Sequence, residues 1–187
     1  MRRHTISLIV ENKFGVLARI AGLFSGRGFN IDSISVGESV EPGTARMTIV
    51  TQGDEIIIEQ IMKQLNRLIN IIRVVDLTDD SFINRELALI KVNASAGTRP
   101  EIVQIAEIFR AKIVDISQKT LTIEATGNED KIDAVIGMLR PFGLKEIART
   151  GRVALSREYR GKDQPRQPAP AAPVWERERL NIAADPA

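Results

Sequence analysis

Gly15 stands between two segments of different hydrophobic period, and this arrangement constrains the fold more than any other feature of the chain. Residues His4–Glu11 alternate apolar and polar side chains, as a strand does. Residues 16–24 place apolar side chains at helical spacing, and Gly28 suits the end of that helix because glycine readily adopts the left-handed conformation. Asn30 opens a second alternating segment. The helix start therefore offers free backbone N–H groups beside a glycine, where a small carboxylate can bind.

The segments after Asn30 extend this order to βαββαβ. We expect, in chain order, a strand around Ile34 and Val36, a turn at residues 41–43, a strand around Met47 and Ile49, a helix that starts at Asp54, and a strand from Asn70 to Leu77. The second helix should bury a stripe formed by Ile57, Ile61, Leu65 and Leu68.

The same order recurs in the second half of the chain with little sequence identity. We expect a strand over Arg85–Ala94, a helix that starts at residues 98–101 with Pro100 near its first turn, paired strands over Lys112–Ser117 and Thr120–Ala125, a helix from Asn128 to about Pro141, and a strand over Leu144–Ala148. The sequence therefore predicts an α+β protein with two tandem βαββαβ domains, residues 1–79 and 84–157.

The remaining segment, residues 158–187, has a different composition. Five of the eight prolines fall there, together with alanine, glutamine and arginine. Such a composition buries too little apolar surface to offset chain entropy, so we expect a disordered tail. Trp175 is the one residue of this tail suited to docking on a partner, and the pattern assigns the tail no role.

Composition also excludes most catalytic chemistry. The 187 residues contain no cysteine and one histidine, so disulfides, thiolate metal sites and multi-histidine metal sites are excluded. His4 is expected to be a surface or strand-end residue rather than a general base. Because no nucleophile pairs with a base, we expect no catalytic residue, no metal and no cofactor on this chain.

Charge and hydropathy restrict the partners. A net charge of +2 is too small to indicate a polyanion partner, and the third strand, TARMTIVT, has no aromatic side chain on which a nucleic-acid base could stack. No apolar run is long enough to span a bilayer, and strand-like sequence begins by residue 4, which leaves no room for a signal peptide. We therefore expect a cytoplasmic protein without nucleic-acid or membrane partners.

The loop before the first helix and the start of the second strand form the candidate binding site. Asn12 and Gly15 flank the helix start, and Asn30, which both donates and accepts hydrogen bonds, follows the helix end. In a side-by-side dimer, Asn30 of one chain could face the Gly15 loop of the other. This combination favours a site that senses an amino acid without transforming it.

Several segments are similar to the family of acetolactate synthase small subunits, the regulatory subunits of acetohydroxyacid synthase, which begin with an ACT domain. They are residues 7–12, 15–20, 23–25, 27–31, 46–49, 61–65, 73–74, 85–92, 108–110 and 113–115. The resemblance covers residues 2–157 and implies a ferredoxin-like fold for both domains, an N-terminal ACT domain and a C-terminal ACT-like domain.

The resemblance also implies a function. Members of this family are non-catalytic partners of a large subunit that carries thiamine diphosphate, magnesium and FAD. They raise its activity and confer feedback inhibition by branched-chain amino acids, usually valine, on the condensation of pyruvate to acetolactate. The family's effector loop maps onto Asn12, Gly15, Val16 and Leu17, with Asn30 and Ile31 facing it across a homodimer interface. Phe14 departs from the pattern, since many members have proline at this position.

Two other functions fit the first half equally well. A free-standing ACT-domain sensor could control a transcription factor or a transporter, and a structural interaction module would bind no ligand at all. The second βαββαβ half favours the subunit, because it can supply the surface that contacts an enzyme. The sequence leaves open which of valine, leucine and isoleucine is preferred.

Overall fold

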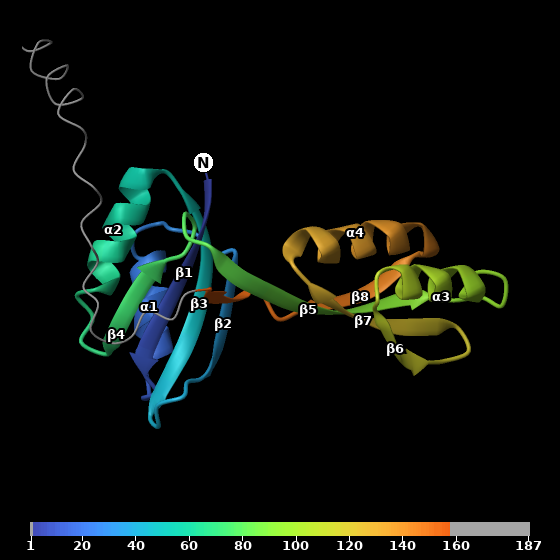
Figure 1. The fold of residues 1–187 in the computed structure, drawn as a ribbon, viewed down its shortest axis with the longest axis horizontal. Coiled ribbons are helices and arrows are strands. Elements are labelled where there is room, and N and C mark those ends of the chain that lie inside the picture. The colour runs from blue at the N-terminus through green and yellow to red at the C-terminus, as the bar shows by residue number, and fades with distance from the viewer. Residues whose placement is uncertain (1, 158–187) are drawn as a thin grey trace, which may run out of the picture. The chain divides into compact units, whose positions relative to one another are not determined.

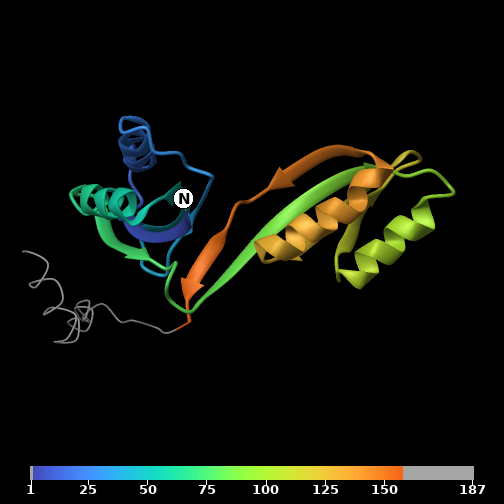
Figure 2. The same cartoon turned by 90° about the horizontal axis from the view of Figure 1, so that it is seen from above.

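The computed structural model describes residues 2–157 (Figures 1 and 2). Within this range, two βαββαβ units follow each other along the chain, each with an antiparallel sheet and two helices, which confirms the predicted fold class. The tail predicted at residues 158–187, with Trp175, lies outside the described residues. None of the helices in residues 2–157 is long and apolar enough to cross a membrane.

The first unit contains six regular elements. They are β1 (Arg2–Glu11), α1 (Val16–Ser25), β2 (Ser33–Glu38), β3 (Thr44–Gly53), α2 (Glu55–Leu65) and β4 (Ile71–Asp76). The strand order is β2-β3-β1-β4, so β1 and β3 are central and β2 and β4 form the edges. Alternating residues of β1 and β3, including Ile6, Leu8 and Ile49, pack against Ile20 and Phe24 of α1 and against α2 in one apolar core.

The second unit repeats this arrangement. Its elements are β5 (Phe82–Asn93), α3 (Arg99–Ile108), β6 (Lys112–Ile116), β7 (Thr120–Gly127), α4 (Glu129–Leu139), a short 3-10 helix (Arg140–Phe142) and β8 (Leu144–Arg149). The strand order is β6-β7-β5-β8. Ile90 and Ile123 of the sheet and Ile102, Ile132 and Leu139 of the helices are fully buried in its core.

Both predicted helix caps are present. The Asp54 side chain accepts a hydrogen bond from the N–H of Ile57 over 2.8 Å, and the Asn128 side chain accepts one from Lys131 over 3.2 Å. A side-chain oxygen in this position satisfies one of the donors that a helix start leaves without an intrahelical acceptor. The starts of α2 and α4 are therefore fixed by local sequence.

The structure differs from the predicted elements in four places. Helix α1 ends at Ser25, and the predicted stop, Gly28, lies in the following turn with φ +71°. Strand β2 starts at Ser33, so Asn30 precedes it. Ile58 takes the place of Ile57 in the buried stripe of α2, and Leu68 follows the end of that helix.

The fourth difference is an additional strand, β9 (Val153–Ser156), that the sequence did not predict. It pairs with Phe82–Arg85, the first part of β5, and forms a two-stranded ribbon (Figure 2). The ribbon lies against the face of the first sheet that carries no helices, where the N–H of Ala154 donates to the hydroxyl of Thr48 over 3.3 Å. Ala154 and Thr48 are both buried there, so this contact joins the two repeats.

Candidate functional site

The loop between β1 and α1 carries the first group of predicted effector residues. The chain leaves β1 at Asn12, whose backbone N–H donates to the carbonyl of Gly43 over 2.8 Å, and it turns into the helix at Gly15. Gly15 has φ +80°, a conformation that favours glycine. Among the described residues other than its chain neighbours, no atom lies within 4 Å of the position that a Cβ would take. The space beside Gly15 is open.

Helix α1 begins without the side chains that commonly satisfy a helix start. Gly15 occupies the capping position, and the first turn contains no acidic residue. The N–H of Val16 donates to the carbonyl of Lys13 over 3.3 Å. Within residues 2–157, no acceptor is found for the N–H groups of Leu17 and Ala18. These two donors and the positive end of the helix dipole can bind a carboxylate.

Charged side chains surround this loop. The Asn70 amide accepts a hydrogen bond from Arg19 and donates one to Glu11, each over 2.6 Å. Glu11 also pairs with Lys13 at 3.1 Å. The hydrogen bonds from Asn70 and then from Lys13 hold the pKa of Glu11 below its ordinary value. The negative charge of Glu11 is thus paired with the positive charge of Lys13.

The predicted residues of this loop differ in exposure. The Val16 side chain is 4% exposed and belongs to the core, so it supports the loop by packing. Leu17 is 47% exposed and stands at the first turn of α1, where it can contact a ligand. Phe14 is fully exposed. Of these three, Leu17 is the apolar side chain suited to lining a binding site.

Asn30 and Ile31 lie at the opposite end of the same sheet. The Thr51 hydroxyl donates to the carbonyl of Asn30 over 2.5 Å, and Thr51 pairs across the sheet with His4, near the start of β1. Asn12 follows the end of β1. The two groups are separated by about eight strand residues, or roughly 26 Å at about 3.3 Å per residue. One chain alone does not bring the predicted residues together.

The Asn30 side chain is held by a carboxylate that sequence analysis did not single out. Its Nδ2 donates to Oδ1 of Asp32 over 2.8 Å, while Oδ2 of Asp32 accepts from Gln52 at 2.9 Å and from Arg3 at 3.1 Å. Burial opposes the charged form of Asp32, but the hydrogen bonds from Gln52, Arg3 and Asn30 outweigh it, and the pKa of Asp32 lies below its usual value. Asp32 therefore stays charged and fixes the orientation of the Asn30 amide.

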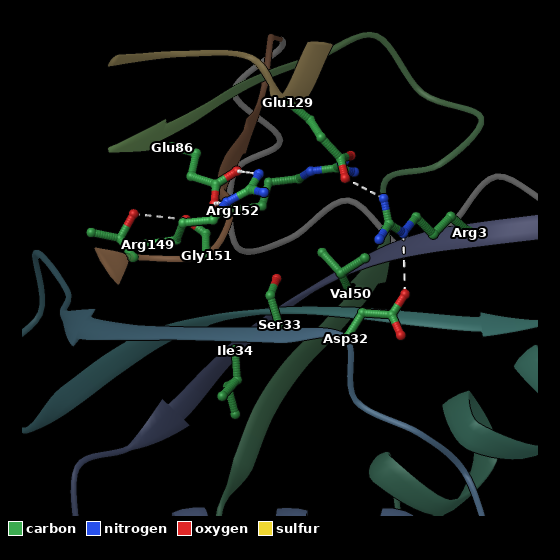
Figure 3. A pocket seen from close by; sticks show the side chains of 11 residues that line it. Arg3, Asp32, Ser33, Ile34, Val50, Glu86, Glu129, Arg149, Gly151 and Arg152 are labelled. Atoms are coloured by element: carbon green, nitrogen blue, oxygen red, sulfur yellow. Dashed lines mark hydrogen bonds and ion pairs between the residues drawn. The ribbon is translucent and has the colours of Figure 1, made fainter. Parts of the chain in front are cut away.

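A polar pocket of about 350 Å³ adjoins Asp32 (Figure 3). It is lined by Arg3, Asp32, Ser33, Ile34, Val50, Glu86, Glu129, Arg149, Thr150, Gly151 and Arg152. Each lining arginine is paired with a lining carboxylate: Arg3 with Asp32 and Glu129, Arg152 with Glu129, and Arg149 with Glu86 in a two-pronged contact of 2.6 and 2.9 Å. The pocket is therefore an internal ion-pair cluster and not an open anion site.

His4 lies near the start of β1, which fits the expectation of a strand-end residue, but it is buried and not at the surface. It is 4% exposed, and its Nδ1 lies 3.1 Å from Oδ2 of Asp76 on the neighbouring strand β4. The other oxygen of Asp76 accepts from the backbone N–H of Thr78 over 2.9 Å. A histidine placed in this way does not face a solvent-accessible site. Among residues 2–157, no group of three or more histidines and carboxylates is placed to hold a metal ion.

The residues that sequence analysis missed are Arg3, Asp32 and Glu129. Asp32 lies two residues after Asn30, a local spacing that could have marked it as a partner of that amide. No local pattern connects Arg3 with Glu129, because 126 residues separate them. Only the folded arrangement of the two repeats brings them together.

Comparison with known proteins covers both repeats. Residues 6–73 match the family described as the AHAS small subunit-like ACT domain, and residues 85–158 match the family described as the small subunit of acetolactate synthase. The chain is 55% identical over 165 residues to an acetolactate synthase small subunit from Aquifex aeolicus, and this match covers 88% of this chain and 86% of the relative. It is 51% identical to one from Mycobacterium bovis, over 86% of this chain and 95% of the relative.

A solved structure gives the same result. The crystal structure of the small subunit of acetolactate synthase from Thermotoga maritima has a TM-score of 0.78 with this chain and 44% sequence identity. The match covers 85% of this chain and 99% of that chain. Sequence and fold therefore agree across nearly all of the described residues.

Proposed function

The chain belongs to the family of acetolactate synthase small subunits, and by homology we propose that it is the regulatory subunit that associates with a large catalytic subunit of this enzyme. In this proposal it raises the activity of the large subunit and makes it sensitive to valine or another branched-chain amino acid. Thiamine diphosphate, magnesium and FAD belong to the large subunit, and the complex is cytoplasmic. The supporting observation is the open helix start at Gly15, which offers donors without any reactive side chain.

The register of the first sheet supports an effector site shared between two copies of the chain. Strand β2 is an edge strand. Its last residue, Glu38, pairs with Ala45, which pairs with Val10 near the end of β1. The end of β2 thus lies at the same end of the sheet as the loop that starts at Asn12, with β3 between β2 and β1, whereas the start of β2 follows Asn30.

Antiparallel pairing of two β2 edges then assembles the site. The start of β2 in the second copy lies opposite the end of β2 in the first, which places Asn30 and Ile31 of the second copy next to the Gly15 loop of the first. Val36 on β2 and Leu17 on α1 are each 47% exposed, and such apolar surface is suited to an interface. A closed two-fold dimer contains two equivalent sites.

The chemistry of this shared site matches a small amino acid. The effector carboxylate accepts from the N–H groups of Leu17 and Ala18, the Asn12 and Asn30 amides hold its polar groups, and its apolar side chain contacts Leu17 and Ile31. Hydrogen bonds to a charged group contribute about 1.5–3 kcal/mol each. Burial of an isopropyl group adds roughly 1.5–3 kcal/mol. After the costs of ordering the ligand and the site, we expect a binding free energy of about −8 to −4 kcal/mol, which corresponds to a micromolar to millimolar dissociation constant.

Such binding can regulate the attached enzyme because the ligand spans two chains. It favours the dimer arrangement that places both halves of the site together, and a coupling of about 1–3 kcal/mol is typical of allosteric control.

The deciding experiment is acetolactate formation by the large subunit with and without this chain, titrated with valine. The proposal predicts higher activity with the chain and inhibition by valine only when it is present. Equal activity in all conditions would contradict it.

Gly15→Asp should abolish feedback inhibition while leaving stimulation of the large subunit largely intact. Aspartate tolerates the left-handed conformation better than most residues, so the loop keeps its shape. The new carboxylate occupies the open space beside Gly15 and repels the carboxylate of the effector. The measurement is a valine titration of acetolactate formation by the complex.

Gly15→Asn is the matched control, since it has the same shape without the charge. Inhibition should be weakened in this variant and absent in Gly15→Asp, and the difference between the two reports the repulsion between like charges. A Gly15→Asp complex that remains fully sensitive to valine would place the effector elsewhere.

A further inference from the structure

A continuous series of side-chain contacts connects Asn30 with the second repeat. Asp32 accepts from Asn30 with one oxygen and from Arg3 with the other. Nη1 of Arg3 donates to Oε1 of Glu129, and Oε2 of Glu129 accepts from Arg152 (Figure 3). The planar guanidinium of Arg3 therefore bridges a carboxylate of the first repeat and a carboxylate of the second.

The far end of this series is the start of helix α4. Glu129 is the first residue of α4, directly after the cap Asn128, where a carboxylate interacts favourably with the helix dipole. Arg152 returns from Glu129 to the first sheet, because its Nη1 donates to the hydroxyl of Thr5 over 2.7 Å. The start of α4 is thus linked to two neighbouring residues of β1: to Arg3 directly through Glu129, and to Thr5 through Arg152.

The carboxylates of these contacts are partly buried, whereas the Arg3 side chain that joins them is 45% exposed. The side chains of Asp32, Arg152 and Glu129 are 13%, 16% and 26% exposed, respectively. Exposed pairs contribute little because water and salt screen them, whereas partly buried networks of charges are screened less. Three side chains, Arg3, Asn30 and Gln52, also donate hydrogen bonds to Asp32, so its position depends on all of them.

We infer that the series Asn30–Asp32–Arg3–Glu129, defined here as the charge relay, transmits effector binding from the shared site of the first repeat to helix α4 of the second repeat. This inference rests on the proposed effector site, because Asn30 must contact the effector. Contact with the effector displaces the Asn30 side chain without rotating its amide, which changes the length of its hydrogen bond to Asp32 and thereby the bridge made by Arg3. Asp32 and Arg3 act here as positioning residues, since neither touches the ligand.

Reciprocity gives a first test. If effector binding changes the Arg3–Glu129 contact, then removal of that contact changes effector affinity, although Glu129 belongs to the other repeat. Glu129→Gln should shift the dissociation constant of valine, measured by calorimetry on the full chain, by between about 2-fold and 30-fold. In amide hydrogen exchange, valine should alter protection at Lys131 and Ile132 of the wild-type α4 and leave it unaltered in Glu129→Gln.

Asp133→Asn is the matched control. Asp133 lies one turn further along α4 and pairs with Arg149 at 3.0 Å, outside the charge relay. This variant should keep the wild-type valine affinity and the valine-dependent exchange at the start of α4. Equal behaviour of Glu129→Gln and wild type in both measurements would overturn the relay, while valine binding itself would still stand.

A second test needs no effector and separates failure of the relay from failure of the proposed function. Asp32→Asn and Glu129→Gln, combined in a double-mutant cycle of urea unfolding, should be non-additive by about 3-fold or more in the unfolding equilibrium constant, because both carboxylates share Arg3. Asp32→Asn with Asp133→Asn should be additive. Additive behaviour of both pairs would overturn the relay, whereas a wild-type chain that binds no valine would overturn the proposed function and with it the role of Asn30.

Discussion

Asp32 is the residue on which the orientation of Asn30 depends. It accepts hydrogen bonds from Asn30, Gln52 and Arg3, and these bonds keep its pKa below the ordinary value in spite of burial. A side chain with three donors and one negative charge can hold an amide in a single orientation, because rotation of the amide would place its oxygen against the carboxylate. This is a stronger constraint on a binding residue than packing alone.

The stability that Asp32 contributes should disappear in acid. The pKa of Asp32 is lowered in the folded chain, so the unfolded chain binds more protons as the pH falls below about 3.9, the ordinary value for aspartate. Its stabilising contribution is therefore complete above that pH and is lost as the pH falls toward the folded pKa. Urea unfolding of wild type and Asp32→Asn should show a constant difference in free energy between pH 5 and 7 and a smaller one below pH 4. A difference independent of pH would show that the charge of Asp32 does not stabilise the fold.

Residues with short-range roles could be predicted from sequence, and residues with long-range partners could not. Asp54 and Asn128 were predicted as helix starts because a cap contacts a backbone N–H only three residues away. Gly28 was predicted to end α1 in the left-handed conformation; it has that conformation, with φ +71°, but the helix already ends at Ser25. The burial of His4 was missed because it depends on Asp76, the last residue of β4.

At the scale of elements, β9 shows where periodicity fails. Its four residues are too few for a hydrophobic period to be recognised, and it exists because the start of β5 extends beyond the second sheet and offers an unpaired edge. The turn that leads into it contains Gly151, with φ +76°. A Cβ at Gly151 would lie 3.1 Å from the Cβ of Ser33 on β2, so the turn approaches the first repeat closely.

Gly151→Ala should therefore destabilise the chain more than the same change at a comparable glycine. A non-glycine residue in the left-handed region costs roughly 1–2 kcal/mol, and the close approach to Ser33 adds to this cost. Gly43→Ala is the control, because Gly43 also has φ +76° but no atom of the described residues lies within 4 Å of its Cβ position. Thermal unfolding should rank the melting temperatures as wild type, Gly43→Ala and then Gly151→Ala. Equal melting temperatures for the two variants would show that the turn does not press against β2.

At the scale of the whole molecule, the proposed effector site is the feature for which one sequence gives only part of the argument. The βαββαβ order of both repeats follows from local periods, which is why the fold class was confirmed. The sheet order β2-β3-β1-β4, which no local pattern determines, leaves β2 at an edge of the sheet. The β1-α1-β2 path places Gly15 and Asn30 at opposite ends of that sheet, so a predicted site that contains both requires a second chain. The open edge of β2 supplies a surface for that chain.

Mixed dimers provide the decisive test of a site shared between chains. Gly15→Asp and Asn30→Ala should each weaken valine binding in a dimer of identical chains, because both sites then carry the defect. A mixed dimer of the two variants combines Gly15 from one chain with Asn30 from the other, so one of its sites carries both defects and its second site carries neither. Two-fold symmetry then predicts about one valine per mixed dimer with wild-type affinity, against about two for the wild-type dimer. Calorimetry on mixed dimers purified through a different tag on each chain measures this stoichiometry. If the mixed dimers bind no valine with wild-type affinity, the site is not shared between chains. Each site would then lie within a single chain, where the distance along β1 keeps Gly15 and Asn30 from contacting the same ligand.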